Sequence, residues 1–323
     1  MNKPIAIIAG EPNSISSEII FKTWKIRKKF KHKNFFIIGS INLLNFQKKK
    51  LKINIKLKKI NDNLNQKSLS KNFLPVYDVD YNQKKTFSKI SSKSNKYIFS
   101  CFEIALKLVK YKKILGFINC PISKEYLFKN NHQGITEYLS KKVSGNNEEV
   151  MLIFNKELSV APITTHIPLK LVNKKISVKK ITTKIKIINT FYKKFFNKTP
   201  KIGVLGLNPH NFSQLSKPEE KIFIEKAIKI LRKLKIKVLG PISSDSSFVN
   251  FKKKNLDVIV GMYHDQVLTP FKALYKYKAI NVTLGLPYVR VSPDHGVAED
   301  IIGKNIANYQ SLIESIKFFN HIK

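Results

Sequence analysis

Short apolar runs recur along the whole chain, each bounded by turn residues and separated from the next by longer, more polar stretches. Bounded runs of about four to eight apolar residues are typical of buried strands. The stretches between them suit helices, most clearly over 216–234, where Ser216, Pro218 and Glu219 form a capping-box start. This alternation predicts an α/β fold with a largely parallel sheet. The expected strands are 4–10, 34–40, 112–120, 158–165, 201–208, 235–240, 256–263 and 279–285.

The remaining segments indicate a reduced, non-membrane protein. No apolar run reaches the length of a membrane span, and the apolar part of the first residues is too short for a signal peptide. Cys101 and Cys120 lie in apolar surroundings without metal-type spacing, so we expect reduced core residues and a cytoplasmic location. The lysine- and asparagine-rich segment 48–72 is expected to be a surface excursion.

The net charge of +39 raises the hypothesis of nucleic-acid binding. However, of the 60 basic residues only Arg27, Arg232 and Arg290 are arginine, the residue that nucleic-acid readers use for bidentate contacts. The lysines are spread along the chain, and they accompany abundant isoleucine and asparagine, as an AT-rich genome produces. We therefore expect no specific nucleic-acid partner, although the charge favours anionic substrates.

Three of the seven histidines share one position relative to the expected strands. His166, His210 and His264 each follow the carboxyl end of a buried run, and Asp265 stands beside His264. In open α/β sheets this edge binds ligands. Three imidazoles there suit a catalytic divalent metal with an open coordination position. The alternative is that these histidines are polar residues that meet solvent at strand ends by chance.

The segment 279–300, "AINVTLGLPYVRVSPDHGVAED", holds one of the few arginines. The guanidinium of Arg290 is suited to clamp a phosphate or a carboxylate. The alternative is a structural ion pair with Asp294.

Several long motifs together resemble the 4-hydroxythreonine-4-phosphate dehydrogenase family of vitamin B6 biosynthesis, and the similarity covers nearly the full length. The motifs are "CPISKE" (120–125), "GITEYLS" (134–140), "TTHIPL" (164–169), "GLNPH" (206–210), "GPISSD" (240–245), "MYHDQ" (262–266) with Lys272, and "NVTLGLPYVRVSPDHG" (281–296).

This resemblance implies a fold like that of the isocitrate and isopropylmalate dehydrogenases, with two α/β/α lobes and active sites shared across a homodimer. We expect one lobe from 1–129 with 295–323, on the cofactor side, and the other from 130–294, for metal, substrate and dimerisation. The resemblance makes His166, His210 and His264 the metal ligands, one of them supplied by the partner subunit. It implies substrate binding by Thr136, Lys272, Asn281 and Arg290, and catalysis by Lys272, Asp245 and Asp265.

The implied reaction is the oxidation by NAD of 4-phosphooxy-L-threonine to 2-amino-3-oxo-4-phosphooxybutanoate. This product then loses carbon dioxide to give 3-amino-2-oxopropyl phosphate. A divalent zinc, magnesium or cobalt ion would acidify the substrate hydroxyl and favour the decarboxylation as a Lewis acid.

The chain departs from the implied family pattern at several places, including the stretch after His210, which has lost its glycines, and Val267, which fills a glycine position. In the opening "GEPNSISSE" (10–18), Glu11 replaces an aspartate, and Ser14 and Ser16 stand where glycines are usual. Ile135 replaces the histidine before Thr136, and an apolar side chain cannot bond a phosphate oxygen.

These changes keep a paralogue open, one that acts on a phosphorylated erythronate or threonate or on a dihydrodiol. Other classes to test are a metal-dependent hydrolase that needs no NAD, a basic nucleic-acid-binding protein, and a decayed enzyme kept for assembly.

Overall fold

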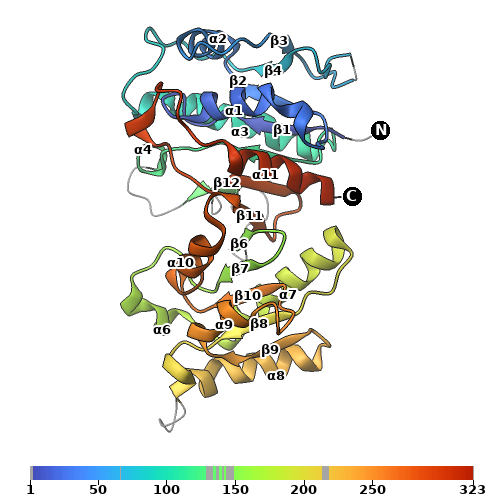
Figure 1. Cartoon of the computed structure of the whole chain (residues 1–323), viewed down its shortest axis with the longest axis vertical. Helices are drawn as coiled ribbons and strands as arrows, with labels where there is room; N and C mark the ends of the chain where they lie inside the picture. The colour runs from blue at the N-terminus through green and yellow to red at the C-terminus, as the bar shows by residue number, and fades with distance from the viewer. Residues whose placement is uncertain are drawn as a thin grey trace. The chain divides into compact units, whose positions relative to one another are not determined.

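The computed structural model describes residues 3–65, 67–128, 134–135, 138–139, 142, 149–212 and 218–322. The chain divides into two compact units: unit 1 is Met1–Leu139 with Pro287–Lys323, and unit 2 is Ser140–Leu286. Each unit contains a mainly parallel sheet with helices packed against it, which confirms the predicted α/β class (Figure 1). The lobe boundaries expected from the sequence, after residues 129 and 294, stay a prediction.

The described sheet of unit 1 is parallel throughout, in the order β3-β4-β2-β1-β5-β12. Its central strands are apolar and fully buried, as expected for strands covered on both faces. The strands are β1 (Ile5–Ile8), β2 (Phe35–Gly39), β3 (Leu57–Ile60), β4 (Leu74–Asp78), β5 (Gly116–Asn119) and β12 (Val289–Pro293).

The helices of unit 1 form two packing groups. Helix α1 packs against α2 and α11, whereas α3 packs against β1, β2 and β5. The buried side chains of α3 include Cys101, and Cys120 follows β5; both are free and buried, as predicted for reduced core cysteines. The helices are α1 (Ser16–Lys25), α2 (Ile41–Lys50), α3 (Asn95–Lys110), α4 (Lys124–Phe128) and α11 (Gln310–Phe318).

The described sheet of unit 2 has the order β11-β6-β7-β10-β8-β9. Strand β6 runs antiparallel to both of its neighbours, and β7, β10, β8 and β9 are mutually parallel. Strand β10 therefore lies between β7 and β8. The strands are β6 (Val150–Phe154), β7 (Ser159–Pro162), β8 (Ile202–Leu205), β9 (Val238–Ile242), β10 (Val258–Gly261) and β11 (Ile280–Leu284).

Helices cover the sheet of unit 2 in two pairs. Helices α7 and α8 pack together, and α9 packs against α10. The core under α10 joins Val267 and Phe271 of the helix to Val160 and Ile259 of the sheet, all buried. The helices are α6 (Val172–Lys175), α7 (Val178–Phe196), α8 (Glu225–Lys233), α9 (Ser244–Asn250) and α10 (His264–Tyr275).

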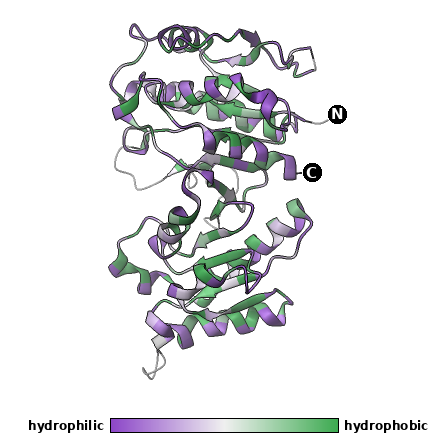
Figure 2. Ribbon diagram, viewed as in Figure 1, coloured by the Kyte–Doolittle hydropathy of each residue, from purple (hydrophilic) through white to green (hydrophobic). Residues whose placement is uncertain are grey.

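All eight expected strands are present; seven are shorter than expected, and β9 begins later and extends two residues beyond the expected end at 240. Figure 2 shows their hydrophobic colouring in both units. The helix expected over 216–234 consists of the π-helical turn η5 (Glu220–Ile224) followed by α8, and Ser216 lies outside the described residues. One expectation needs correction: segment 48–72 contains β3, an edge strand that pairs with β4 through its backbone while its lysines face solvent. No described helix is long and apolar enough to cross a membrane.

Candidate functional site

Three neighbouring strands of unit 2 end at the edge where the singled-out histidines lie. His166 follows β7, His264 follows β10, and His210 follows β8. Because these strands are parallel and β10 pairs with both others, their carboxyl ends meet at one edge of the sheet. We call this edge, with the loops 163–170, 206–212, 243–246 and 262–265, the rim.

His166 and His264 lie side by side on the rim. Their ring centroids are 5.6 Å apart. The two loops are joined by backbone bonds, from Ile163 N to Gly261 O at 2.8 Å and from Thr164 N to Met262 O at 3.1 Å. The buried Thr164 hydroxyl donates a third bond to Met262 O at 2.7 Å. These three hydrogen bonds to main-chain carbonyls thus hold the loops that carry the two imidazoles beside each other.

His264 has a carboxylate partner within its own helix. It is the first residue of α10, and its Nδ1 lies 2.8 Å from Oδ1 of Asp265. When Nδ1 carries the proton it donates to Asp265, and the Nε2 lone pair is left for a metal ion. Paired carboxylate and histidine groups of this kind orient the ring and raise its basicity as a ligand.

His210 lies on a sharp turn after β8, where its backbone has a positive φ of 49°. The turn is held by Glu220, a buried carboxylate at the start of η5. Oε1 of Glu220 accepts hydrogen bonds from the backbone N–H groups of Leu207 and Asn208, both at 2.8 Å. These charge-assisted bonds fix the course of the backbone that leads to His210.

Asp245 extends the rim beyond His210. It lies in the first turn of α9, which follows β9, the neighbour of β8. Its Oδ1 accepts hydrogen bonds from Ser243 Oγ at 2.8 Å and from Ser246 N at 2.6 Å. These bonds, together with the nearby charge of His210, lower the pKa of Asp245. The exposed carboxylate therefore stays ionised at neutral pH.

The metal prediction can be tested against the donors of this single chain. His166 and His264 are brought together, while His210 follows the strand on the other side of β10. Among the residues described, no three histidine, cysteine or acidic side chains are grouped closely enough to bind one metal ion. The imidazole pair with its carboxylate partner is a donor set that suits a divalent transition metal. The three-histidine site stays a prediction.

Lys272 and Asn281 belong to the same unit. Lys272 follows Asp265 by seven residues on α10, so the two exposed residues share one face of the helix about two turns apart. Asn281 on β11 pairs in register with Ile153 of β6, and directly paired residues point to the same face. Ile153 belongs to the core under α10, so Asn281 lies on the α10 side of the sheet. Its buried Oδ1 has no hydrogen-bond partner among the described residues.

The remaining predicted binding residues belong to unit 1. Arg290 on β12 is buried, and its Nε donates a hydrogen bond to Oδ1 of Asn119 at 2.7 Å, which orients the guanidinium plane. Thr136 lies outside the described residues. Ile135 is buried, so the position that the family gives to a histidine is here part of the apolar interior.

The loop after β1 uses its polar residues differently. Glu11, Ser14 and Ser16 are all buried. Glu11 accepts hydrogen bonds from Asn13 N at 3.1 Å and from Ser94 Oγ at 2.9 Å. Burial raises the pKa of Glu11 despite these bonds. Ser14 Oγ donates to Glu11 O at 2.7 Å and lies 2.7 Å from Ser16 Oγ. Ser14 and Ser16, where the resemblance implies glycines, thus bond to each other and to main-chain oxygens.

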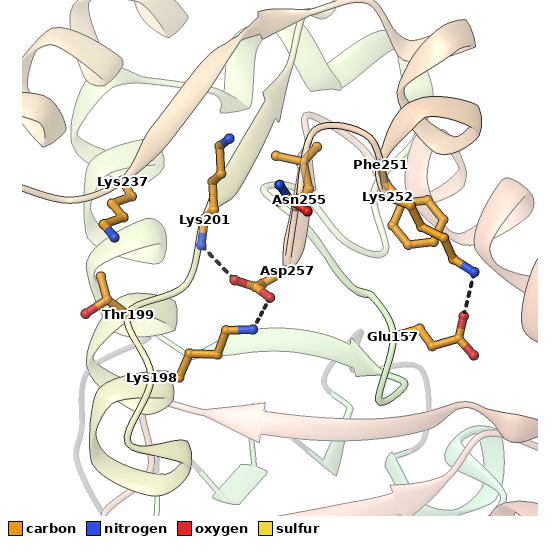
Figure 3. Close-up of a pocket in the computed structure, with 10 residues that line it drawn as sticks. Glu157, Lys198, Thr199, Lys201, Lys237, Phe251, Lys252, Asn255 and Asp257 are labelled. Carbon is orange, nitrogen blue, oxygen red and sulfur yellow. Dashed lines mark hydrogen bonds and ion pairs between the residues drawn. The ribbon is translucent and has the colours of Figure 1, made fainter.

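A lysine-lined hollow of about 510 Å³ lies elsewhere in unit 2 (Figure 3). Asp257, just before β10, forms an ion pair with Lys198 at 2.5 Å and accepts a bond from Lys201 N at 2.9 Å. Lys252 pairs with Glu157 at 3.3 Å. The hollow is at the amino ends of β8 and β10, opposite the rim, and two of its cations are already neutralised. It does not coincide with any predicted site residue.

Comparisons with known proteins agree over nearly the whole chain. The family described as pyridoxal phosphate biosynthetic protein PdxA matches residues 31–319. A 4-hydroxythreonine-4-phosphate dehydrogenase of Sulfurihydrogenibium sp. is 38% identical over 97% of this chain and 96% of its own length. A relative from Oceanobacillus iheyensis, provisionally named a D-threonate 4-phosphate dehydrogenase, is 30% identical over 97% of this chain and 96% of its own. The crystal structure of the 4-hydroxythreonine-4-phosphate dehydrogenase of Klebsiella pneumoniae superposes with a TM-score of 0.87 at 28% identity, covering 99% of both chains.

Proposed function

The chain belongs to the pyridoxal phosphate biosynthetic protein PdxA family, and on that premise we propose that it is an NAD- and metal-dependent 4-hydroxythreonine-4-phosphate dehydrogenase. It would oxidise 4-phosphooxy-L-threonine to 2-amino-3-oxo-4-phosphooxybutanoate, which decarboxylates to 3-amino-2-oxopropyl phosphate on the route to pyridoxine 5'-phosphate. The observation that carries the proposal is the pair of imidazoles at the carboxyl edge of parallel strands, with an Asp265 carboxylate behind His264.

His166, His210 and His264 are the residues proposed to hold the cation. A divalent zinc, magnesium or cobalt ion bound there supplies Lewis acidity toward the substrate hydroxyl and the carbonyl that replaces it. Asp265 fixes the ring of His264, so that the same nitrogen always faces the rim. One chain brings two of the histidines together, which supports a site shared across a homodimer.

The acidic residues of the rim take different parts. Oxidation removes the hydroxyl proton and transfers the carbon-bound hydrogen as hydride to NAD, whose role here rests on family membership. Asp245 has a lowered pKa, so it is a weak proton acceptor and acts instead as a fixed negative charge. We assign proton transfer to Asp265 or Lys272, which share the exposed face of α10.

The proposed substrate-binding residues offer an amide oxygen and two positively charged side chains. The Oδ1 of Asn281, which accepts no hydrogen bond from the part of the chain that the structure describes, can accept one from a substrate hydroxyl or ammonium group. Arg290, oriented by Asn119, is suited to a phosphate or carboxylate, and Lys272 adds a positive charge. Thr136 completes the set that the family implies.

The name of the Oceanobacillus relative favours a second candidate of the same chemistry, and the buried Ile135 keeps it open. A side chain without a donor cannot bond an anionic oxygen there, and the Oceanobacillus relative carries a threonate name. The second candidate is therefore a dehydrogenase of a phosphorylated threonate or erythronate; a dihydrodiol, which lacks the phosphate, is a more distant version.

The test is NADH formation with each candidate acid in turn, on protein loaded with zinc, magnesium or cobalt. The proposal expects turnover of 4-phosphooxy-L-threonine and little turnover of the acids that lack the amino group. Turnover of threonate or erythronate phosphate alone would assign the second candidate. Substrate cleavage that proceeds equally well without NAD would instead identify a hydrolase.

A further inference from the structure

The side chain of Gln266 joins three loops of the rim. Its Oε1 accepts a hydrogen bond from Met262 N at 2.6 Å, within its own loop. Its Nε2 donates to Gly206 O at 2.7 Å and to Ser244 Oγ at 2.8 Å. Gly206 precedes the turn that carries His210, and Ser244 is adjacent to Asp245. One amide therefore links the loops after β10, β8 and β9.

Glutamine is the side chain that fits these partners. The amide group has one acceptor oxygen and two N–H donors, and here the oxygen and the nitrogen are all used. Gln266 is 9% exposed, so a lost bond leaves a buried polar group without compensation from water. Glutamate would keep the acceptor but lose the donor to Gly206 O, and methionine would keep the size and lose every bond.

The backbone leaves room for this side chain at Gly261, the last residue of β10. A Cβ on Gly261 would lie 2.8 Å from Oε1 of Gln266 and 2.5 Å from Cγ1 of Val267. Both distances are too short for real contacts, so any larger residue at 261 displaces the start of α10 or the amide. The absence of a side chain at 261 is thus a condition for the position of Gln266.

Glu220 shows how Gln266 differs from an ordinary loop anchor. Glu220 accepts hydrogen bonds from the backbone N–H groups of Leu207 and Asn208, and these bonds hold only the one turn that carries His210. Gln266 binds the same turn at Gly206 but also binds the loops that carry His264 and Asp245. Its bonds set the positions of these loops relative to one another.

We propose that Gln266 is a positioning residue that sets the placement of His264 for cation binding, because it ties the start of α10 to the loops after β8 and β9. The inference rests on the proposed function, because it assumes that His264 binds a divalent ion. Partners that orient metal ligands typically change metal affinity by about 10- to 100-fold when they are removed. The effect of Gln266 should fall in that range even though it touches no ligand side chain.

The experiment is a titration of the full chain with cobalt(II), followed by its visible absorption and by calorimetry. Gln266→Met should weaken cobalt binding at least about tenfold and change the absorption band, because the ligand geometry changes. Gln266→Glu and Ser244→Ala, which keep part of the network, should give smaller losses in the same direction. These milder variants also keep the test valid if Gln266→Met folds poorly.

The matched control is Gln47→Met in unit 1. Gln47 is also buried, and its Nε2 donates to Pro12 O at 2.7 Å and to Thr86 O at 3.3 Å. Its replacement should lower the melting temperature and leave the cobalt affinity and spectrum unchanged. Equal loss of cobalt binding in the Gln47 and Gln266 variants would reduce the role of Gln266 to general stability and overturn the inference.

His264→Ala in the same titration separates the two proposals. If cobalt binding needs His264 but all Gln266 variants bind as the wild type does, the positioning role is wrong and the proposed function stands. If the wild type binds no cobalt, or binds it without His264, the metal site itself is wrong and both proposals fall.

Discussion

The loop after β1 in unit 1 and the loops after β7 and β10 in unit 2 occupy equivalent places, at the carboxyl ends of parallel strands. In the first, Glu11, Ser14 and Ser16 are buried and bond to one another, to main-chain groups or to the Ser94 hydroxyl. In the second, the His166 and Asp265 side chains are exposed. The same topological position thus carries a closed polar cluster in one unit and an open donor set in the other.

The difference shows that strand-end position alone does not make a site. A buried polar group whose hydrogen bonds are already satisfied inside the protein contributes little to ligand binding. To bind a ligand it would first have to break those internal hydrogen bonds. The Asp265 carboxylate at the rim, by contrast, is largely exposed to solvent. The following predictions test whether the rim binds a ligand and whether the polar residues of the β1 loop serve only internal hydrogen bonds.

The largest effect is expected at the rim. His264→Ala removes a proposed ligand, and NADH formation with saturating metal should fall about 1000-fold, since the lost Lewis acidity contributes several kcal/mol. The control is His321→Ala, an exposed histidine of unit 1, which should keep wild-type turnover. A His264 variant with more than a tenth of wild-type turnover would contradict a catalytic role for the rim.

A smaller loss is expected for Asp265→Asn. The amide keeps the size of Asp265 but not the charge that pairs with Nδ1 of His264. Metal affinity should fall by about 10- to 100-fold, as for other partners of metal-binding histidines. Calorimetric titration with zinc or cobalt measures the change. Unaltered metal affinity together with reduced turnover would instead assign Asp265 to proton transfer alone.

The closed loop predicts an effect on stability with a defined sign. Because the pKa of Glu11 is raised above the ordinary value of 4.5, its contribution to stability is present below that value and is lost as the pH rises through the folded-state pKa. Glu11→Gln cannot ionise, so its melting temperature relative to wild type should increase from acid to neutral pH. Thermal melts across that range, with the exposed Glu125→Gln as control, measure it. A difference in melting temperature between Glu11→Gln and wild type that does not vary with pH would show that burial does not raise the pKa of Glu11.

The smallest effect is expected for Ser14→Ala. It removes a buried hydrogen bond to Glu11 O and should cost about 1 kcal/mol, or about 2 °C in melting temperature for a chain of this size. Turnover and the KM for NAD should not change. A rise of more than a few-fold in the KM for NAD would show that the β1 loop binds cofactor and would remove the contrast between the two regions.

Much of the fold follows from local pattern. Strands β1, β2 and β10 are continuous apolar runs because both of their faces are buried, and such runs are visible in the sequence. Strand β3 is not visible, since an edge strand with lysines facing solvent lacks that signal. The π-helical turn η5 has no local sequence signal either. Its buried Glu220 accepts a hydrogen bond from the backbone of Leu207, which is thirteen residues away in sequence.

The candidate site was predictable in part for the same reason. His166, His210 and His264 follow visible strands, so topology places them at one edge. Gln266 could not be assigned a role, because its partners at Gly206 and Ser244 lie 60 and 22 residues away and are main-chain or hydroxyl groups that any sequence contains. Its only sequence signal is its place in the "MYHDQ" motif.

The central claim is that the rim of unit 2 binds the divalent cation that the reaction needs. Anomalous diffraction from crystals grown with cobalt(II) tests it most directly, because the metal is located without reference to activity. The account predicts an anomalous peak within bonding distance of His166 and His264. A cobalt ion held by other residues in protein that forms NADH only with metal present would contradict it.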